Sequence, residues 1–203
     1  MTIRPLVVIT AAAIAACASV AMAEPNFGHF EGKFVAEFGD DGRKVTLIEP
    51  FAFVDPGGEE WSVPAGAKTD GASVPSALWA LYPPFTGSYR SAAAIHDYYC
   101  DTRMRTWQDT HKVFYWAMRA ANVDANTAKF MYSAVYLFGP RWGPGTAPGQ
   151  RNAAVKVSPA KQEEMLKELK DYVEKEDPDL DSLVAHARAM SAKPSAAAPK
   201  AAE

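Results

Sequence analysis

The sequence predicts an α+β domain: a small N-terminal antiparallel sheet followed by a bundle of about four helices, with a C-terminal helical extension. Three observations support this prediction. Residues 30–66 show alternating apolar positions, residues 75–142 repeat apolar side chains at helical spacing, and a Pro- and Gly-rich stretch then precedes two amphipathic segments. A chain of 203 residues is expected to hold one core of this kind plus appendages.

The first 23 residues have the features of an export signal. Arg4 supplies a positive charge, Leu6 to Ala16 form an apolar run, and Ala21-Met22-Ala23 has the small-x-small pattern of a cleavage site. This run is too short to span a bilayer, which takes about 20 residues. We therefore expect an exported protein, periplasmic or secreted, whose mature chain begins at Glu24.

A second interpretation of this segment uses Cys17. The sequence from Ile14 to Cys17 resembles a lipobox, which would make the protein a lipoprotein anchored through Cys17. In either case Cys17 is removed or lipidated, so Cys100 has no partner for an intramolecular disulfide.

The charge balance bears on partners. The chain carries 21 basic and 24 acidic residues, a formal net charge of −3, and has no basic stripe. Proteins that bind nucleic acid usually show such a stripe, so we predict no nucleic-acid partner.

The predicted strands lie at the start of the domain. Lys33–Phe38 and Lys44–Val54 alternate aromatic and branched side chains, and Trp61 and Val63 begin a third strand. The simplest arrangement is one antiparallel meander over residues 30–66. Pro50 is expected to bend the second strand.

The first two predicted helices flank a proline stop. One begins at Pro75, near enough to Ser73 for capping, and ends at Pro83-Pro84. The next spans Ser88–Cys100, where apolar residues recur at helical spacing.

Two further helices complete the predicted bundle. Thr106 and Asp109 have the spacing of a capping box, and Asp124 starts a helix that ends at Gly139-Pro140. Beyond them, Ser158-Pro159 and Asp177-Pro178 are predicted to cap two helices that pack against the core or a protein partner. The expected organisation is a signal peptide (1–23), a globular domain (24–142), a linker (143–157), a helical extension (158–190) and a disordered tail (191–203).

Four motifs in order resemble a known family. They are VPAGAKTDGASVP (63–75), AAAIHDYYC (92–100), Asp109 with Phe114, Ala117 and Met118, and VYLFGPRW (135–142). The sequence is similar here to an uncharacterised bacterial and phage family, domain-of-unknown-function family 1353. The resemblance implies a small α+β domain and no established activity.

The adjacent pair His96-Asp97 is the first candidate for chemistry. Metal-dependent phosphohydrolases use such a pair on a helix, but they need further histidines on other helices. The remaining histidines are His29, His111 and His186, so the full signature is absent. A hydrogen-bonded core histidine is the competing interpretation of His96, which falls on an apolar helix face.

Cys100 follows His96 by four residues, so both lie on one helix face within reach of a shared zinc ion. Two ligands are a weak signal, and a buried inert thiol is the competing interpretation. A catalytic Cys–His pair is a further alternative, but the sequence marks no third residue that would orient the histidine and no oxyanion hole.

The turn Asp70-Gly71-Ala72-Ser73 could place Asp70 and Ser73 opposite His96, or it could be a structural Asx turn. We predict Asp70, Ser73, His96 and Asp97 as catalytic residues, with His96, Asp97 and Asp70 as candidate ligands of an unidentified divalent metal.

The expectation from these residues is an exported, envelope-associated or secreted protein of unknown function, for which a hydrolase with an Asp/Ser/His-Asp site is the candidate activity. The alternative is a non-catalytic binding or structural module of phage origin, as the distribution of the resembled family implies. Arg103, Arg105 and Arg141 are candidates for neutralising an anionic ligand, although solvated surface is their default role.

Overall fold

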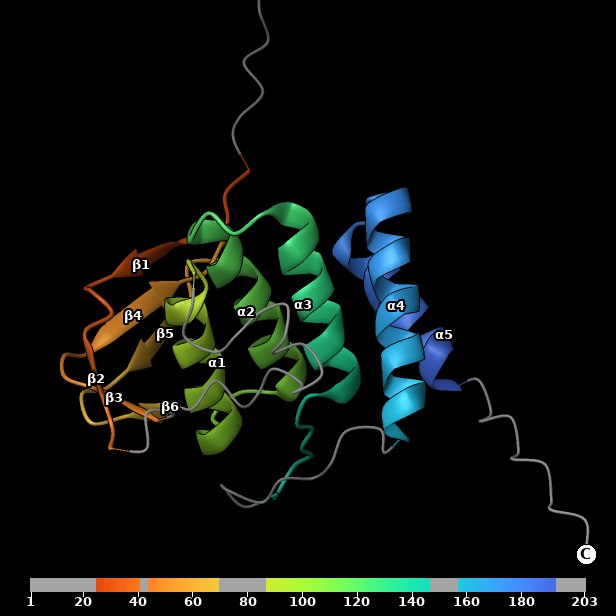
Figure 1. The fold of residues 1–203 in the computed structure, drawn as a ribbon. Helices are drawn as coiled ribbons and strands as arrows, with labels where there is room; N and C mark the ends of the chain where they lie inside the picture. Colours follow the sequence, from red (N-terminus) through yellow and green to blue (C-terminus); the bar gives the residue numbers. More distant parts are fainter. Residues whose placement is uncertain (1–24, 41–43, 70–86, 147–156, 193–203) are drawn as a thin grey trace, which may run out of the picture.

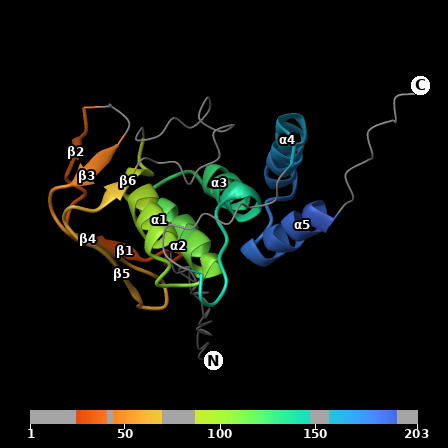
Figure 2. The ribbon, with the colours of Figure 1, turned by 90° about the horizontal axis from the view of Figure 1, so that it is seen from below.

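The computed structural model describes residues 25–40, 44–69, 87–146 and 157–192. Strands and helices occupy successive layers, as Figures 1 and 2 show from two directions. The sheets lie at one side, helices α1 and α2 follow, α3 comes next, and α4 and α5 cover the far side of α3. The predicted α+β class is confirmed.

In the described ranges, six short strands form two three-stranded antiparallel sheets with orders β1-β4-β5 and β2-β3-β6. Their bounds are β1 (His29–Glu31), β2 (Ala36–Phe38), β3 (Val45–Leu47), β4 (Phe51–Val54), β5 (Glu60–Val63) and β6 (Lys68–Thr69).

The arrangement of strands corrects the predicted single meander. The predicted strand 44–54 is divided at residues 48–50, and its halves β3 and β4 join different sheets. Pro50 lies at the division because it has no backbone N–H to donate to a ladder. β1 and β6, the outer strands that pair with β4 and β3, are too short to leave a periodic signal.

The apolar face of β4 and β5 contributes to the core. Phe51 pairs with Val63 and Phe53 pairs with Trp61, and all four side chains are buried. Trp61 meets Tyr99 of α1 edge to face, with ring centroids 4.8 Å apart. This face therefore positions α1 against the sheet.

Local capping explains the helix starts. The helices of the central layers are α1 (Arg90–Thr102), α2 (Trp107–Ala120) and α3 (Ala125–Phe138). Thr106 accepts a hydrogen bond of 3.1 Å from the Asp109 backbone N–H, and Asp124 accepts one of 3.1 Å from the Thr127 N–H. Both predicted caps are confirmed, whereas the helix predicted from Pro75 lies outside the described residues.

The C-terminal extension packs on the rest of the chain. Helices α4 (Pro159–Glu176) and α5 (Leu180–Ala192) both contact α3. Their buried side chains belong to the same core cluster as those of α1 to α3; they are Met165, Leu166, Leu169, Val173, Leu183, Ala187 and Met190.

The predicted cap of the last helix is wrong by two residues. Asp177 ends α4 with a left-handed backbone (φ 43°), and Asp179 caps α5 by accepting a 2.7 Å hydrogen bond from the Ser182 N–H. Asp177 is held at the end of α4, where its N–H donates to the Val173 carbonyl. None of the helices in the described ranges has the length and apolar character needed to cross a membrane.

The shared core predicts cooperative unfolding of the extension with the domain. We expect Leu169→Ala to lower the free energy of unfolding by about 2–5 kcal/mol through cavity formation, in a single denaturant transition. The neighbouring change Lys170→Ala, at an exposed position, should alter it by less than about 0.5 kcal/mol. A separate early transition in Leu169→Ala, with the main transition unchanged, would contradict a shared core.

Candidate functional site

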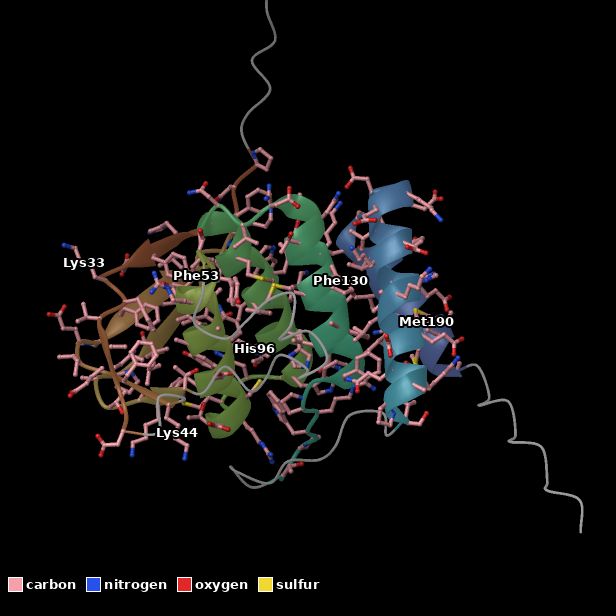
Figure 3. The ribbon with its side chains drawn as sticks, in the orientation of Figure 1. Lys33, Lys44, Phe53, His96, Phe130 and Met190 are labelled. Carbon is pink, nitrogen blue, oxygen red and sulfur yellow. The ribbon has the colours of Figure 1, made fainter. Side chains whose placement is uncertain are left out.

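The packed helices α1 and α2 bring two histidines together in the interior. His96 lies in the middle of the molecule in Figure 3 and exposes 1% of its surface. Its Nε2 atom is 2.8 Å from Nδ1 of His111 on α2, and its ring stacks on Phe114 with centroids 4.8 Å apart. The two imidazoles therefore share a hydrogen bond away from solvent.

Cys100 adds a sulfur to this pair. It lies one helical turn after His96, and its Sγ atom is 3.6 Å from His96 Nε2. Ligand atoms of His96, Cys100 and His111 lie within 4.8 Å of one another, and all three residues are buried. We call these three residues the donor cluster, because each offers a nitrogen or sulfur lone pair.

Aromatic side chains surround His111. Its ring centroid is 5.5 Å from Trp107 and 6.5 Å from Trp142. Gly139 passes so close that a Cβ atom there would lie 3.2 Å from His111 Cε1 and 2.3 Å from the Val135 carbonyl oxygen. A larger residue at this helix end would displace the backbone or the imidazole.

Burial keeps both imidazoles uncharged at neutral pH. Desolvation lowers the pKa of His96 to about 3. The pKa of His111 falls well below its usual value, first because of burial and then because of repulsion from His96 and Arg141. The Pro140 carbonyl, which lies near His111, raises its pKa by a smaller amount. The contact is not a well-formed hydrogen bond, because the buried Nε2 atom of His111 has no hydrogen-bond partner among the described residues.

Asp97 faces a different partner from its neighbour. Its Oδ2 atom accepts a hydrogen bond from the Thr69 hydroxyl, and its Oδ1 atom is 4.0 Å from His96 Nδ1, beyond hydrogen-bond length. The carboxylate therefore connects α1 to β6. His96 and Asp97 therefore contact different partners and do not form one shared site.

The geometry covers only part of the predicted site. His96 and Asp97 are both buried, whereas Asp70 and Ser73 lie outside the described residues. Sequence reasoning did not include His111. A signal for it existed, because His111 lies three residues before Phe114 and seven before Met118, the spacing of one helix face.

A surface hollow of about 660 Å³ lies on the far side of the two indoles that contact His111. Trp107 and Trp142, which contact His111, also line this hollow, and both are partly exposed. Arg103 and Arg105 are further lining residues. The two indoles thus separate the cluster from the hollow.

Comparison with known families follows the motifs identified in the sequence. Residues 45–135 match the family model described as "Protein of unknown function (DUF1353)". Over this segment the chain is similar to the DUF1353 family. The match begins at β3 and ends within α3, so it contains every residue of the donor cluster. The resemblance predicted from the sequence is confirmed.

Two relatives from Sinorhizobium fredii (strain NBRC 101917 / NGR234) are similar to the chain over 125 and 133 residues. "Uncharacterized protein y4jT" is 45% identical over 125 residues, which are 60% of this chain and 37% of the relative. "Uncharacterized protein y4iH" is 43% identical over 133 residues, 63% of this chain and 54% of the relative. The chain thus spans about half or less of either relative. No solved structure matches it.

The lowered pKa of His96 predicts that acid destabilises the protein. In the unfolded chain the imidazole protonates near pH 6.5, but in the folded chain only near pH 3, so the unfolded state binds more protons between these values. Stability is then fully present above pH 6.5 and is lost as the pH falls towards 3. We expect the free energy of unfolding to fall by up to about 1.4 kcal/mol per pH unit in this window.

Denaturant titrations between pH 7 and pH 4, with EDTA present so that no ion shields the imidazoles, measure this effect. His96→Gln should give a shallower dependence than the wild type. Parallel profiles for the two proteins would mean that His96 protonates alike in the folded and unfolded states.

Proposed function

We propose that this chain is an exported hydrolase whose reacting centre is the donor cluster. The observation that supports it is the convergence of two uncharged imidazoles and a thiol on one buried point, next to a hollow open to solvent. Such donors can hold an ion that activates water, or accept a proton from it.

The arrangement argues against Cys100 as a nucleophile in a triad. In a Cys–His pair with an orienting group, the base uses one ring nitrogen for the nucleophile and the other for the orienting group. Here the sulfur and His111 both approach Nε2 of His96, at 3.6 and 2.8 Å. Activation of water at the shared point is the hydrolytic mechanism that this geometry favours.

The substrate would approach through the hollow. Trp107 and Trp142 form its inner wall and touch His111, so movement of one indole would connect the hollow to the cluster. Arg103 and Arg105 lie in its lining beside Asp109, and Arg105 also forms an ion pair with Glu59, so the lining carries charges of both signs.

The remaining predicted catalytic residues have separate roles in this proposal. Asp70 and Ser73 lie outside the described residues and remain predicted to face His96 in a pocket that binds a metal or activates water. Asp97 acts as a positioning residue, because its hydrogen bond with Thr69 holds the helix that carries His96.

Chromogenic ester and phosphodiester substrates test the hydrolytic function. We expect His96→Gln and His111→Gln each to lower kcat/KM by about 10²- to 10⁴-fold, the range of a lost acid–base or ion-holding group. His186→Gln is the matched control, because His186 lies on α5 outside the cluster, and its activity should equal that of the wild type. Equal activity of all three variants would place hydrolysis elsewhere or exclude it.

We also propose that the protein is exported to the periplasm or beyond, by cleavage after Ala23. The sequence from Arg4 to Ala23 supports this localisation. Intact mass spectrometry of protein recovered from the cell envelope and medium should give a chain beginning at Glu24. A mass that corresponds to acylated Cys17 would instead identify a membrane-anchored lipoprotein, and an uncleaved Met1 chain would contradict export.

A second candidate function is a non-catalytic binding or structural module of phage origin. The 1% exposure of His96 favours it, because a catalytic base needs access to substrate. The hollow lined by Trp107 and Trp142 would then be the ligand site itself. Ligand binding without turnover, unaffected by His96→Gln, is the result that separates this function from the first.

A further inference from the structure

We propose that the donor cluster binds one divalent ion of the zinc class, through His96 Nε2, His111 Nδ1 and Cys100 Sγ. The proposal identifies the ion that the proposed hydrolase would use. It stands without hydrolysis, however, because the same ion could also be structural. The evidence consists of ligand type, geometry and surroundings.

The ligand types select the ion. One thiolate and two imidazoles are typical ligands of zinc, whereas calcium and magnesium prefer oxygen. No carboxylate belongs to the cluster among the described residues, and Asp97 directs Oδ2 to Thr69. A site of this composition therefore excludes the common oxygen-seeking cations.

The three ligand atoms lie within 4.8 Å of one another, so the widest pair would close by up to about 1.2 Å around a tetrahedral ion. With zinc–nitrogen bonds of about 2.0–2.1 Å and zinc–sulfur bonds of about 2.3 Å, neighbouring ligands lie roughly 3.6 Å apart for nitrogen and sulfur and roughly 3.3 Å apart for two nitrogens. The Cys100 Sγ to His96 Nε2 distance is 3.6 Å. The His96 to His111 distance of 2.8 Å is that of a hydrogen bond, so the imidazoles would separate by roughly 0.5 Å around the ion. The shared proton would move to the other nitrogen of its own ring, which keeps both imidazoles neutral, and the Cys100 thiol would release its proton to water.

The fold holds the three ligands on regular helices. His96 and Cys100 occupy successive turns of α1, and His111 comes from α2, against which α1 packs. Ligands on helices keep their geometry better than ligands on loops. The packing of α1 against α2 therefore brings the three side chains together without a bound ion.

The surroundings suit a bound ion. Phe114 stacks on His96, and Trp107 and Trp142 flank His111, so the ligands are shielded from water. Two neutral imidazoles and one thiolate leave one positive charge on a divalent ion, and the buried carboxylate of Asp97 lies 4.0 Å from His96 Nδ1. This carboxylate offsets part of the remaining charge. The open fourth position would take water or hydroxide.

The competing interpretation is a hydrogen-bonded histidine pair beside an inert thiol. It accounts for the 2.8 Å contact and requires no ion. The two interpretations differ in stoichiometric metal content and in direct sulfur–metal bonding, and both can be measured.

Cobalt(II) is the probe that reports both. We expect the full chain, stripped with chelator and titrated with Co²⁺, to bind one ion per chain with visible bands of tetrahedral coordination and a sulfur-to-cobalt charge-transfer band in the near ultraviolet. Zn²⁺ should displace it. Cys100→Ala should lose the charge-transfer band, and its affinity for Zn²⁺ should fall by more than about 100-fold.

Two controls keep the test decisive. His29→Gln and His186→Gln remove histidines outside the cluster and should bind Co²⁺ like the wild type. If His111→Gln fails to fold, Cys100→Ala decides, because Ala replaces a thiol that the competing interpretation treats as inert. Absence of stoichiometric Co²⁺ binding by the wild type, or unchanged spectra in Cys100→Ala, overturns the metal site. Metal binding without hydrolysis would overturn only the proposed function.

Discussion

The contact between His96 and His111 is the interaction on which the centre of the domain depends. It joins α1 to α2 at 2.8 Å among mostly aromatic and aliphatic side chains, with the Cys100 sulfur and the Asp97 carboxylate as the polar neighbours of His96. Two imidazoles buried without a partner would destabilise the fold, since an unsatisfied buried polar group costs about 1–3 kcal/mol. Each imidazole therefore requires the other, and the helix packing that buries them also fixes where Cys100 places its sulfur. The structural and the chemical roles of this cluster have the same geometric origin.

Neighbouring residues of α1 have divided roles. His96 and Asp97 are about 100° apart around the helix axis, so one faces α2 and the other faces β6. The hydrogen bond from Thr69 to the Asp97 carboxylate helps to fix α1 against β6. Because His96 is the preceding residue of the same helix, this contact also helps to position its imidazole. A His-Asp dipeptide thus combines a positioning residue and a ligand candidate without placing both at one site.

The C-terminal extension completes a core that the DUF1353 segment leaves open. Helix α3 is buried on most of its circumference, with Phe130, Tyr132 and Tyr136 among its buried residues. Such a helix needs cover on two sides. Helix α2 covers one side of α3, and α4 and α5 cover the other. On that outer side Arg188 donates a 2.8 Å hydrogen bond to the Tyr136 hydroxyl. The extension therefore acts as part of the fold, although it lies beyond the matched residues.

The sequence by itself determined the α+β class, the resemblance to the DUF1353 family, and the helix starts at Thr106 and Asp124, because capping and periodicity depend on residues close together in the chain. It also identified His96 and Cys100 as neighbours on one helix face. Only the tertiary structure decided that the strands divide into two sheets, that Asp97 turns to Thr69, and that His111 closes the cluster from a second helix. These features depend on contacts between residues 15 or more positions apart, such as His96 with His111 and Thr69 with Asp97. No local pattern encodes such contacts, since side-chain packing across elements selects them.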